Sequence, residues 1–277
     1  MHPATPADDK LVFLHIPKTA GSSFTHILKS LYDENQIFHR MDGDELIDLL
    51  NTGKDDYRLY IGHYSYNVVS LFRQRPRLLT FLREPRERMI SHYYYYQAQS
   101  DEAIAAMADR DKYLVEMTRQ YNFMDFISLE SPEIEQGFAN VHTRQLAHST
   151  SDAVPQVEAD RQALLTAAIS HLNTVDFIGI VEKFDASLQL FRQLFGLTTD
   201  IEPVSLNVNR SSRTDSAEIE IFASNHIARR RVELDLQLYE AGNKLFETMR
   251  TAQIVATRRN RYRRLPGAIL RRLGVRR

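Results

Sequence analysis

The sequence contains no cysteine among its 277 residues. This absence excludes disulfide bonds, thiolate zinc sites, iron–sulfur clusters and cysteine nucleophiles. Long hydrophobic runs are also missing: no stretch of about 18 apolar residues occurs, and the N-terminus lacks the basic and apolar regions of a signal peptide. We therefore expect a cytoplasmic protein whose chemistry depends on His, Lys, Arg, Ser, Thr, Asp and Glu or on a bound cofactor.

The formal net charge of -1 conceals an asymmetry along the chain. Residues 251–277 contain nine Arg and no Lys, Asp or Glu, whereas residues 1–250 contain 26 basic and 36 acidic residues. No repeat or low-complexity linker divides the rest, so we predict one domain over 8–250 and an Arg-rich tail over 251–277. The tail is either a solvated segment or a peripheral contact with a membrane or another anionic surface, and we expect no specific nucleic-acid partner.

Short apolar runs predict the strands of a mainly parallel sheet. Each run is followed by polar or turn residues and then by a helical pattern, which indicates a single three-layer α/β domain with helices on both faces. Residues 216–250 show helical spacing, so the C-terminal part is expected to be helical. Ligands of such sheets bind at the carboxyl ends of the strands. The predicted strands are 11–16, 59–61, 78–82 and 177–181.

The loop after the first strand has the residues of a P-loop-like anion site. The N–H groups of a first helical turn have no intrahelical partners, a glycine lets backbone approach an oxyanion, and lysine and hydroxyl groups add donors. The lysine precedes the glycine, so the loop is not a Walker A motif. The alternative is an ordinary junction in which Ser22 or Ser23 is the helix N-cap. The candidate anion-binding residues are Lys18, Thr19, Ala20, Gly21, Ser22 and Ser23.

A second candidate site follows the strand at 78–82. Arg83 stands at the carboxyl end of that strand, and Pro85 is suited to begin a helix. The Arg83 guanidinium can clamp a phosphate, and Ser91, two turns into the helix, can donate a further hydrogen bond. We expect Arg86 and Arg88 to form surface ion pairs with the neighbouring glutamates.

Together, the segments HIPKTAGSSF and FLREPRERMISHYYYY resemble sulfotransferases that use 3′-phosphoadenosine 5′-phosphosulfate (PAPS). The closer likeness is to the branch that contains the heparan sulfate 2-O-sulfotransferases. The resemblance implies that the loop wraps the 5′-phosphosulfate and that Arg83 and Ser91 hold the 3′-phosphate. It also implies that Lys18 stabilises the bridging oxygen as 3′-phosphoadenosine 5′-phosphate (PAP) leaves.

Later segments extend this resemblance to about residue 215. The Gly-His pair in residues 60–66 is similar to the segment that carries the catalytic base of the 2-O-sulfotransferase branch, which implies that His63 is the base. A structural histidine is the alternative, and His92, His142 and Glu182 are rival bases. The segment 207–213 resembles a loop that closes over the nucleotide, so Arg213 is expected to reach the 3′-phosphate.

The segment 140–146 also resembles a family block. There we expect Asn140, Thr143 and Arg144 to line the acceptor site, and the alternative is a helix N-cap followed by a surface arginine.

The predicted function is transfer of a sulfuryl group from PAPS to a hydroxyl group, in line and without a metal ion. The likeness implies a carbohydrate acceptor, and a bacterial source is expected because the membrane anchor of the Golgi enzymes is missing. Two alternatives remain: a nucleotide-dependent kinase of the P-loop kind, and a non-catalytic module that binds a nucleotide or another anion.

Overall fold

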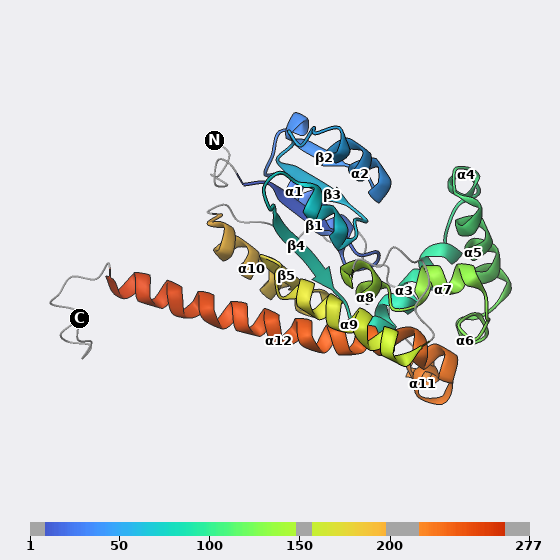
Figure 1. Ribbon diagram of the computed structural model, residues 1–277. Helices are drawn as coiled ribbons and strands as arrows, with labels where there is room; N and C mark the ends of the chain where they lie inside the picture. Colours follow the sequence, from blue (N-terminus) through green and yellow to red (C-terminus); the bar gives the residue numbers. More distant parts are fainter. Residues whose placement is uncertain (1–8, 148–156, 198–215, 264–277) are drawn as a thin grey trace.

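The computed structural model describes residues 9–147, 157–197 and 216–263 (Figure 1). Five strands form a parallel sheet in the order β2-β3-β1-β4-β5. Four of them confirm the predicted strands. The fifth, β2, is only three residues long and half-buried, so it lacks the apolar run that marks the others. The strands are β1 (Leu11–Leu14), β2 (Ile37–His39), β3 (Leu59–Gly62), β4 (Arg77–Leu82) and β5 (Phe177–Ile180).

The order of the strands decides which loops meet. β1 lies between β3 and β4, and Leu14 near its end pairs with Gly62 of β3 and Thr80 of β4. Because the three strands are parallel, the segments that follow them leave the same edge of the sheet beside one another.

Aromatic packing builds one face of the sheet. Phe24 of α1 (Gly21–Lys29) contacts three strand residues, with ring centroids 5.1 Å from Phe13, 4.8 Å from Phe81 and 5.7 Å from Phe177. Phe191 of α10 (Phe184–Phe195) lies 5.0 Å from Phe24 and completes this layer. Edge-to-face and offset rings of this kind fill the space between helix and sheet.

The opposite face is covered by the long helix α12 (His226–Arg263), which runs beside α8 (Val141–Ala147) and α9 (Glu158–Leu172) (Figure 1). Gly242 lets α12 approach the sheet closely, because a Cβ there would lie 2.5 Å from Leu82 and 3.1 Å from Ile178. Helices therefore cover both faces, and the predicted three-layer architecture is confirmed.

A second hydrophobic cluster lies beyond the carboxyl edge of the sheet. It is formed by α3 (Pro85–Gln97), α5 (Asp109–Gln120), α6 (Phe123–Phe126), α7 (Pro132–Phe138) and α11 (Ser216–Ser224), and α4 (Asp101–Ala105) flanks it. Helix α12 joins the two clusters, because Val232 belongs to this one and Leu238 to the sheet core. The remaining elements are α2 (Gly43–Asn51) and the 3-10 turns η1 (Glu34–Gln36), η2 (Tyr66–Leu71) and η3 (Val181–Lys183).

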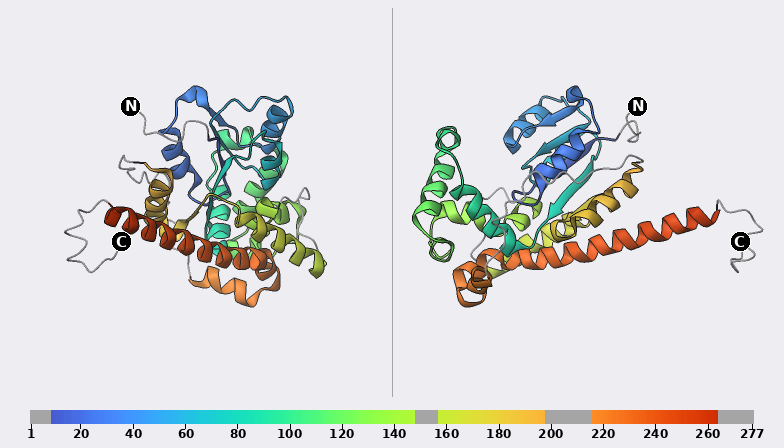
Figure 2. Two further views of the ribbon diagram at one scale, coloured as in Figure 1. Left: turned by 60° about the vertical axis from the view of Figure 1, so that its left-hand side comes forward. Right: turned by 180° about the vertical axis from the view of Figure 1, so that it is seen from behind.

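The C-terminal part is helical, as predicted. Figure 2 shows α12 projecting past the sheet at its C-terminal end. The helix passes residue 250 without a break, so the boundary that we placed between 250 and 251 falls inside it. In the three described ranges, none of the helices combines the length and the apolar character that a membrane span requires.

Candidate functional site

The loop between β1 and α1 has an unusual backbone. Lys18 and Ala20 have φ angles of 69° and 58°, whereas Thr19 between them does not have a positive φ. When residues alternate between left-handed and right-handed backbone conformations, their successive N–H groups point toward one concave side, which is the geometry of an anion-binding nest. Left-handed conformations of residues other than glycine cost on the order of 1–3 kcal/mol each. The buried Thr19 hydroxyl holds this shape by donating to the Ile16 carbonyl oxygen at 2.8 Å.

Helix α1 begins at Gly21, and its N-cap is Ala20, which has no side chain able to cap it. The prediction of Ser22 or Ser23 as N-cap was therefore wrong, because the left-handed Ala20 starts the helix earlier. The N–H groups of the first turn, which have no intrahelical partners, are left for another acceptor. Gly21 is required here for a spatial reason, since a Cβ would lie 1.7 Å from Nε2 of His15.

Cationic side chains from two elements gather at this loop. The Lys18 ammonium lies 4.4 Å from the centre of the Tyr95 ring, and Arg83 donates to the Lys18 carbonyl oxygen at 3.4 Å. Burial lowers the pKa of Lys18 to about 8, and the charges of Arg83 and Arg88 add to the effect. The structure thus places Arg83 beside Lys18.

Ser91 lies on the same side of α3 as the Tyr95 ring. The two residues are four positions apart, which puts them on one face of a helix. Because Tyr95 covers Lys18, the half-buried Ser91 lies on the face that turns toward the loop. Helix α3 begins at Pro85, as its sequence indicates. Tyr95 itself was not assigned, because a run of four tyrosines covers several sides of a helix.

The prediction for Arg88 was wrong, whereas that for Arg86 is confirmed. Arg86 pairs with Glu84 at 2.6 Å, but Arg88 is only 1% exposed. Its guanidinium donates to the Phe138 carbonyl oxygen at 3.1 Å and lies 3.3 Å from Nδ1 of His92. Its Nε has no hydrogen-bond partner in the described part of the chain, and burial lowers the pKa of Arg88 to about 10.

The candidate base His63 follows β3 directly. Its backbone N–H donates to the Met41 carbonyl oxygen at 3.2 Å. Its ring centre lies 4.8 Å from that of His15, beside the loop between β1 and α1, which we call the anion-binding loop after its predicted role. Part of the His63 side chain is exposed to solvent. The surrounding protein nevertheless displaces water from the ring, and this desolvation, together with the charge of His39, lowers the pKa of His63 to about 4. The imidazole is therefore neutral at neutral pH and able to accept a proton.

The rival bases are less accessible or already engaged. His92 is buried and stacks on Phe138 with ring centres 4.8 Å apart, and His142 is fully buried. Glu182 accepts hydrogen bonds from the Glu84 N–H at 2.9 Å and the Tyr239 hydroxyl at 2.7 Å, so each carboxylate oxygen has a partner. Of the four candidates, His63 is therefore favoured by access and by proximity to the loop.

The segment at 140–146 forms a buried polar network with α12. Asn140, at φ 44°, donates to the Arg230 carbonyl oxygen at 2.9 Å and accepts from the Leu234 N–H at 2.9 Å. The N–H and hydroxyl of Thr143 both donate to Asp235 at 2.8 Å. Both side chains are inaccessible to solvent, which argues against a contact with the acceptor. The helix-capping alternative also differs from the structure, because the Asn140 side chain bonds to α12, and Asp235 accepts from the first N–H groups of α8.

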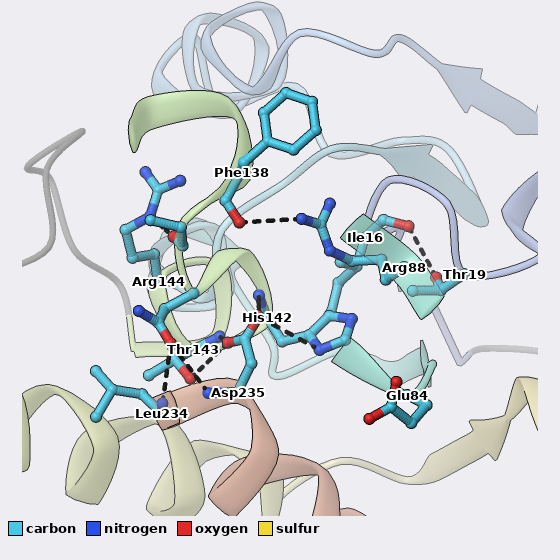
Figure 3. A network of polar contacts seen from close by, with 12 residues as sticks. Ile16, Thr19, Glu84, Arg88, Phe138, His142, Thr143, Arg144, Leu234 and Asp235 are labelled. Atoms are coloured by element: carbon cyan, nitrogen blue, oxygen red, sulfur yellow. Dashed lines mark hydrogen bonds and ion pairs between the residues drawn. The ribbon is translucent and has the colours of Figure 1, made fainter. Parts of the chain in front are cut away.

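Asp235 is the residue of this network that sequence reasoning missed. Figure 3 shows His142 and Thr143 turned toward it. Its carboxylate is 2% exposed and also lies 3.6 Å from Nδ1 of His142. Helical spacing was the available signal, because it puts Asp235 on one face with the apolar Val232 and Leu238, and a buried carboxylate requires partners. Arg144 differs from its neighbours in being half-buried, and it donates to the Ala139 carbonyl oxygen at 2.9 Å.

A cavity of about 1010 Å³ lies elsewhere, between α5, α7, α9 and α12. Of the predicted site residues only Asn140 lines it. Its buried arginines are paired, Arg161 with Glu233 at 2.9 Å and Arg231 with Glu135 at 2.7 Å. The predicted anion-binding residues therefore lie at the sheet edge and not in this cavity. Arg213 and its loop lie outside the described residues.

A sequence-family model matches most of the chain. The model of the sulfotransferase family matches residues 4–247. A protein-tyrosine sulfotransferase of Arabidopsis thaliana is 34% identical over 89 residues, which make up 31% of this chain and 17% of the plant protein. The structure of mouse sulfotransferase SULT7A1 complexed with PAP aligns over 78% of this chain and 64% of that chain, with 14% identity and a TM-score of 0.38. The likeness to the heparan sulfate 2-O-sulfotransferase branch stays a prediction.

Proposed function

Because the chain belongs to the sulfotransferase family, we propose that it transfers a sulfuryl group from PAPS to a hydroxyl group of an acceptor. The observation that carries the proposal is the meeting of three elements at one sheet edge. The anion-binding loop follows β1, Arg83 follows β4, and His63 follows β3. Groups that can bind a polyanionic donor therefore lie beside a group that can accept a proton.

The donor fits the charge of this edge. Lys18 and Arg83 lie close together, and their mutual repulsion is relieved by an anion between or beside them. We assign the first-turn N–H groups of α1 with Ser22 and Ser23 to the 5′-phosphosulfate, and Arg83 with Ser91 to the 3′-phosphate. Arg213 is proposed as a further contact to the 3′-phosphate.

The reaction requires one bond to form and one to break. The acceptor oxygen attacks sulfur while the bond from sulfur to the bridging oxygen of PAP breaks, and the hydroxyl proton passes to the His63 ring. Lys18 stabilises the charge that develops on the leaving phosphate, a contact that strengthens toward the transition state. A bound nucleotide polyanion raises the pKa of His63 above its free value of about 4, which makes the ring a better base when the donor is present. The mechanism requires no metal ion.

We propose a carbohydrate hydroxyl as the acceptor, on the likeness to the 2-O-sulfotransferase branch. A tyrosyl hydroxyl is the second candidate, because the plant relative is named a protein-tyrosine sulfotransferase. Arg144 is the proposed acceptor contact in residues 140–146, since Asn140 and Thr143 are inaccessible. Incubation with labelled PAPS, a panel of glycans and tyrosine-containing peptides, and analysis of the products distinguish the two acceptors.

Nucleotide selectivity tests the donor. Calorimetric titration should show tighter binding of PAP than of ATP, because the 3′-phosphate adds charge-assisted hydrogen bonds. Binding of ATP with no response to PAP would favour the kinase alternative and overturn the proposal.

Replacement of His63 by Ala separates an enzyme from a binding module. General-base catalysis contributes about 10²–10⁴-fold, so turnover should fall by that factor while PAP affinity is retained. His26→Ala, at an exposed position near the end of α1, is the matched control and should keep full turnover. Equal turnover in the two variants would show that another group is the base.

A further inference from the structure

We propose that Gln145 is a positioning residue that fixes the segment carrying His63 against the anion-binding loop. The inference rests on the proposed function, since it concerns how the donor site and the base are held at a constant separation. Gln145 touches neither of them with its side chain; it acts through the backbone on which they are carried.

The geometry is a two-pronged hydrogen bond. The side-chain amide of Gln145 on α8 donates to the His15 carbonyl oxygen at 3.1 Å and to the Tyr64 carbonyl oxygen at 2.9 Å. An amide NH₂ has two hydrogens, and both are used here. Both partners are acceptors, so only the orientation that turns nitrogen toward them satisfies the site. The side chain is 8% exposed, which shields these bonds from water.

The two carbonyl groups lie just beyond the end of the hydrogen-bond ladder between β1 and β3. The last ladder bond between β1 and β3 runs from the His15 N–H to the Gly62 carbonyl oxygen at 2.9 Å. Beyond this bond, the segment after β1 enters the anion-binding loop, and the segment after β3 continues through His63 to Tyr64. Gln145 therefore bridges the two chains just past the end of the ladder, where the sheet itself no longer sets their spacing.

Gln145 is itself carried by a fixed element. Asp235 of α12 accepts hydrogen bonds from the N–H groups of His142 and Thr143, at 3.1 and 2.8 Å, at the beginning of α8 (Figure 3). Helix α12 packs against β4 and β5, so α8 is tied to the sheet and not only to the loops. A bridge mounted on such an element restricts the movement of the segment that carries His63 relative to the loop between β1 and α1.

Positioning of this kind acts on turnover more than on donor binding. In-line transfer needs the reacting atoms in a narrow range of distance and angle, and a displacement of about 1 Å can cost about 100-fold in rate. The donor contacts assigned to the loop and to Arg83 do not involve Gln145. Loss of the bridge is therefore expected to lower kcat while the dissociation constant of PAP is unchanged.

Gln145→Leu tests this, because leucine keeps most of the volume and removes both donors. We expect kcat to fall about 10–100-fold with unchanged PAP affinity by calorimetry. Turnover is followed both as PAPS hydrolysis, with water as acceptor, and as transfer to the acceptor panel. Gln162→Leu on α9 is the matched control, since that exposed side chain bonds only to Glu158 among the described contacts, and its kcat should not change.

A histidine NMR signal gives a second readout that needs no acceptor. With ¹³C-labelled histidine, the His63 resonance should move in Gln145→Leu and stay in place in Gln162→Leu. If Gln145→Leu does not fold, Gln145→Asn, which is one methylene too short to reach both carbonyl groups, replaces it.

The outcomes separate the two proposals. Failure of the unmodified protein to bind PAP would overturn the proposed function. Binding of PAP together with an unchanged kcat and an unmoved His63 signal in Gln145→Leu would overturn the role of Gln145, as would a parallel loss of kcat and PAP affinity.

Discussion

Replacing Gly21 with Ala places a methyl group inside the imidazole ring of His15. An ideal Cβ at this position would lie 1.7 Å from Nε2, 2.0 Å from Cδ2 and 2.4 Å from Cε1 of that ring. The ring has little room to yield, because it stacks on Phe13 with centres 5.4 Å apart and lies 4.8 Å from the His63 ring. The variant must therefore shift either the start of α1 or the end of β1.

The magnitude follows from two opposing effects. Overpacking of a well-filled site costs typically about 1–3 kcal/mol, and an overlap of this depth belongs at the upper end. Where the native backbone suits alanine and no clash occurs, a Gly→Ala change gains about 0.4–1 kcal/mol, chiefly by restricting the unfolded chain. We therefore expect Gly21→Ala to lower the free energy of unfolding by about 2 kcal/mol.

A double-mutant cycle isolates the clash. In a His15→Ala background the ring is absent, so Gly21→Ala should stabilise the protein by up to about 1 kcal/mol. The resulting coupling of about 3 kcal/mol is well above the 0.3–0.5 kcal/mol scatter of independent sites. Urea unfolding of the four proteins measures it, and PAP titration of each shows whether the loop survives. Equal costs of Gly21→Ala in both backgrounds would refute the argument.

Three further predictions concern charged groups. Lys18 has a pKa of about 8, so PAP affinity should decrease as the pH rises through that value and the ammonium loses its charge. Calorimetry below and above pH 8 measures this decrease, which should be absent in Lys18→Met. Burial lowers the pKa of His15 to about 3, so the unfolded state binds more protons between about 3 and 6.5. The contribution of His15 to stability is therefore complete above pH 6.5 and is lost as the pH falls toward 3. In His15→Phe the free energy of unfolding should decrease less between pH 6.5 and pH 3 than in the unmodified protein, and an equal decrease would contradict this. Asp235→Ala should lower the free energy of unfolding by about 3–5 kcal/mol, because it removes the buried acceptor of two N–H groups at the start of α8. The control Glu240→Ala, at an exposed position, should change the free energy of unfolding by less than about 0.5 kcal/mol. Similar urea midpoints for the two variants would rule this prediction out.

The site was predictable where chemistry and chain order coincide. Lys18 and Gly21 lie between an apolar run and a helical pattern, and such a junction in a parallel sheet presents helix N-terminal N–H groups at the edge where ligands bind. Arg83 and His63 were predictable as strand-end residues for the same reason. Their closeness to Lys18 depends on the strand order β3-β1-β4, which local patterns do not encode.

Other residues were misplaced because their environment comes from distant segments. Arg88 has the sequence neighbours of a surface ion pair, but Glu84 pairs with Arg86 instead, and Phe138 from α7 buries the guanidinium. The N-cap of α1 was misassigned because the left-handed Ala20, and not a serine hydroxyl, begins the helix.

The amino-acid sequence alone thus determined the fold class, and it placed the candidate anion-binding residues in the loop after the first strand, since both depend on periodicity and on short-range backbone geometry. The absence of cysteine already excluded thiolate chemistry. Only the tertiary structure decided which of several histidines reaches solvent beside the loop, that Asp235 anchors α8, and that Gln145 bridges His15 and Tyr64. These depend on contacts between residues 48 to 130 positions apart in the sequence, and the energies of such contacts arise only after the strands and helices have packed.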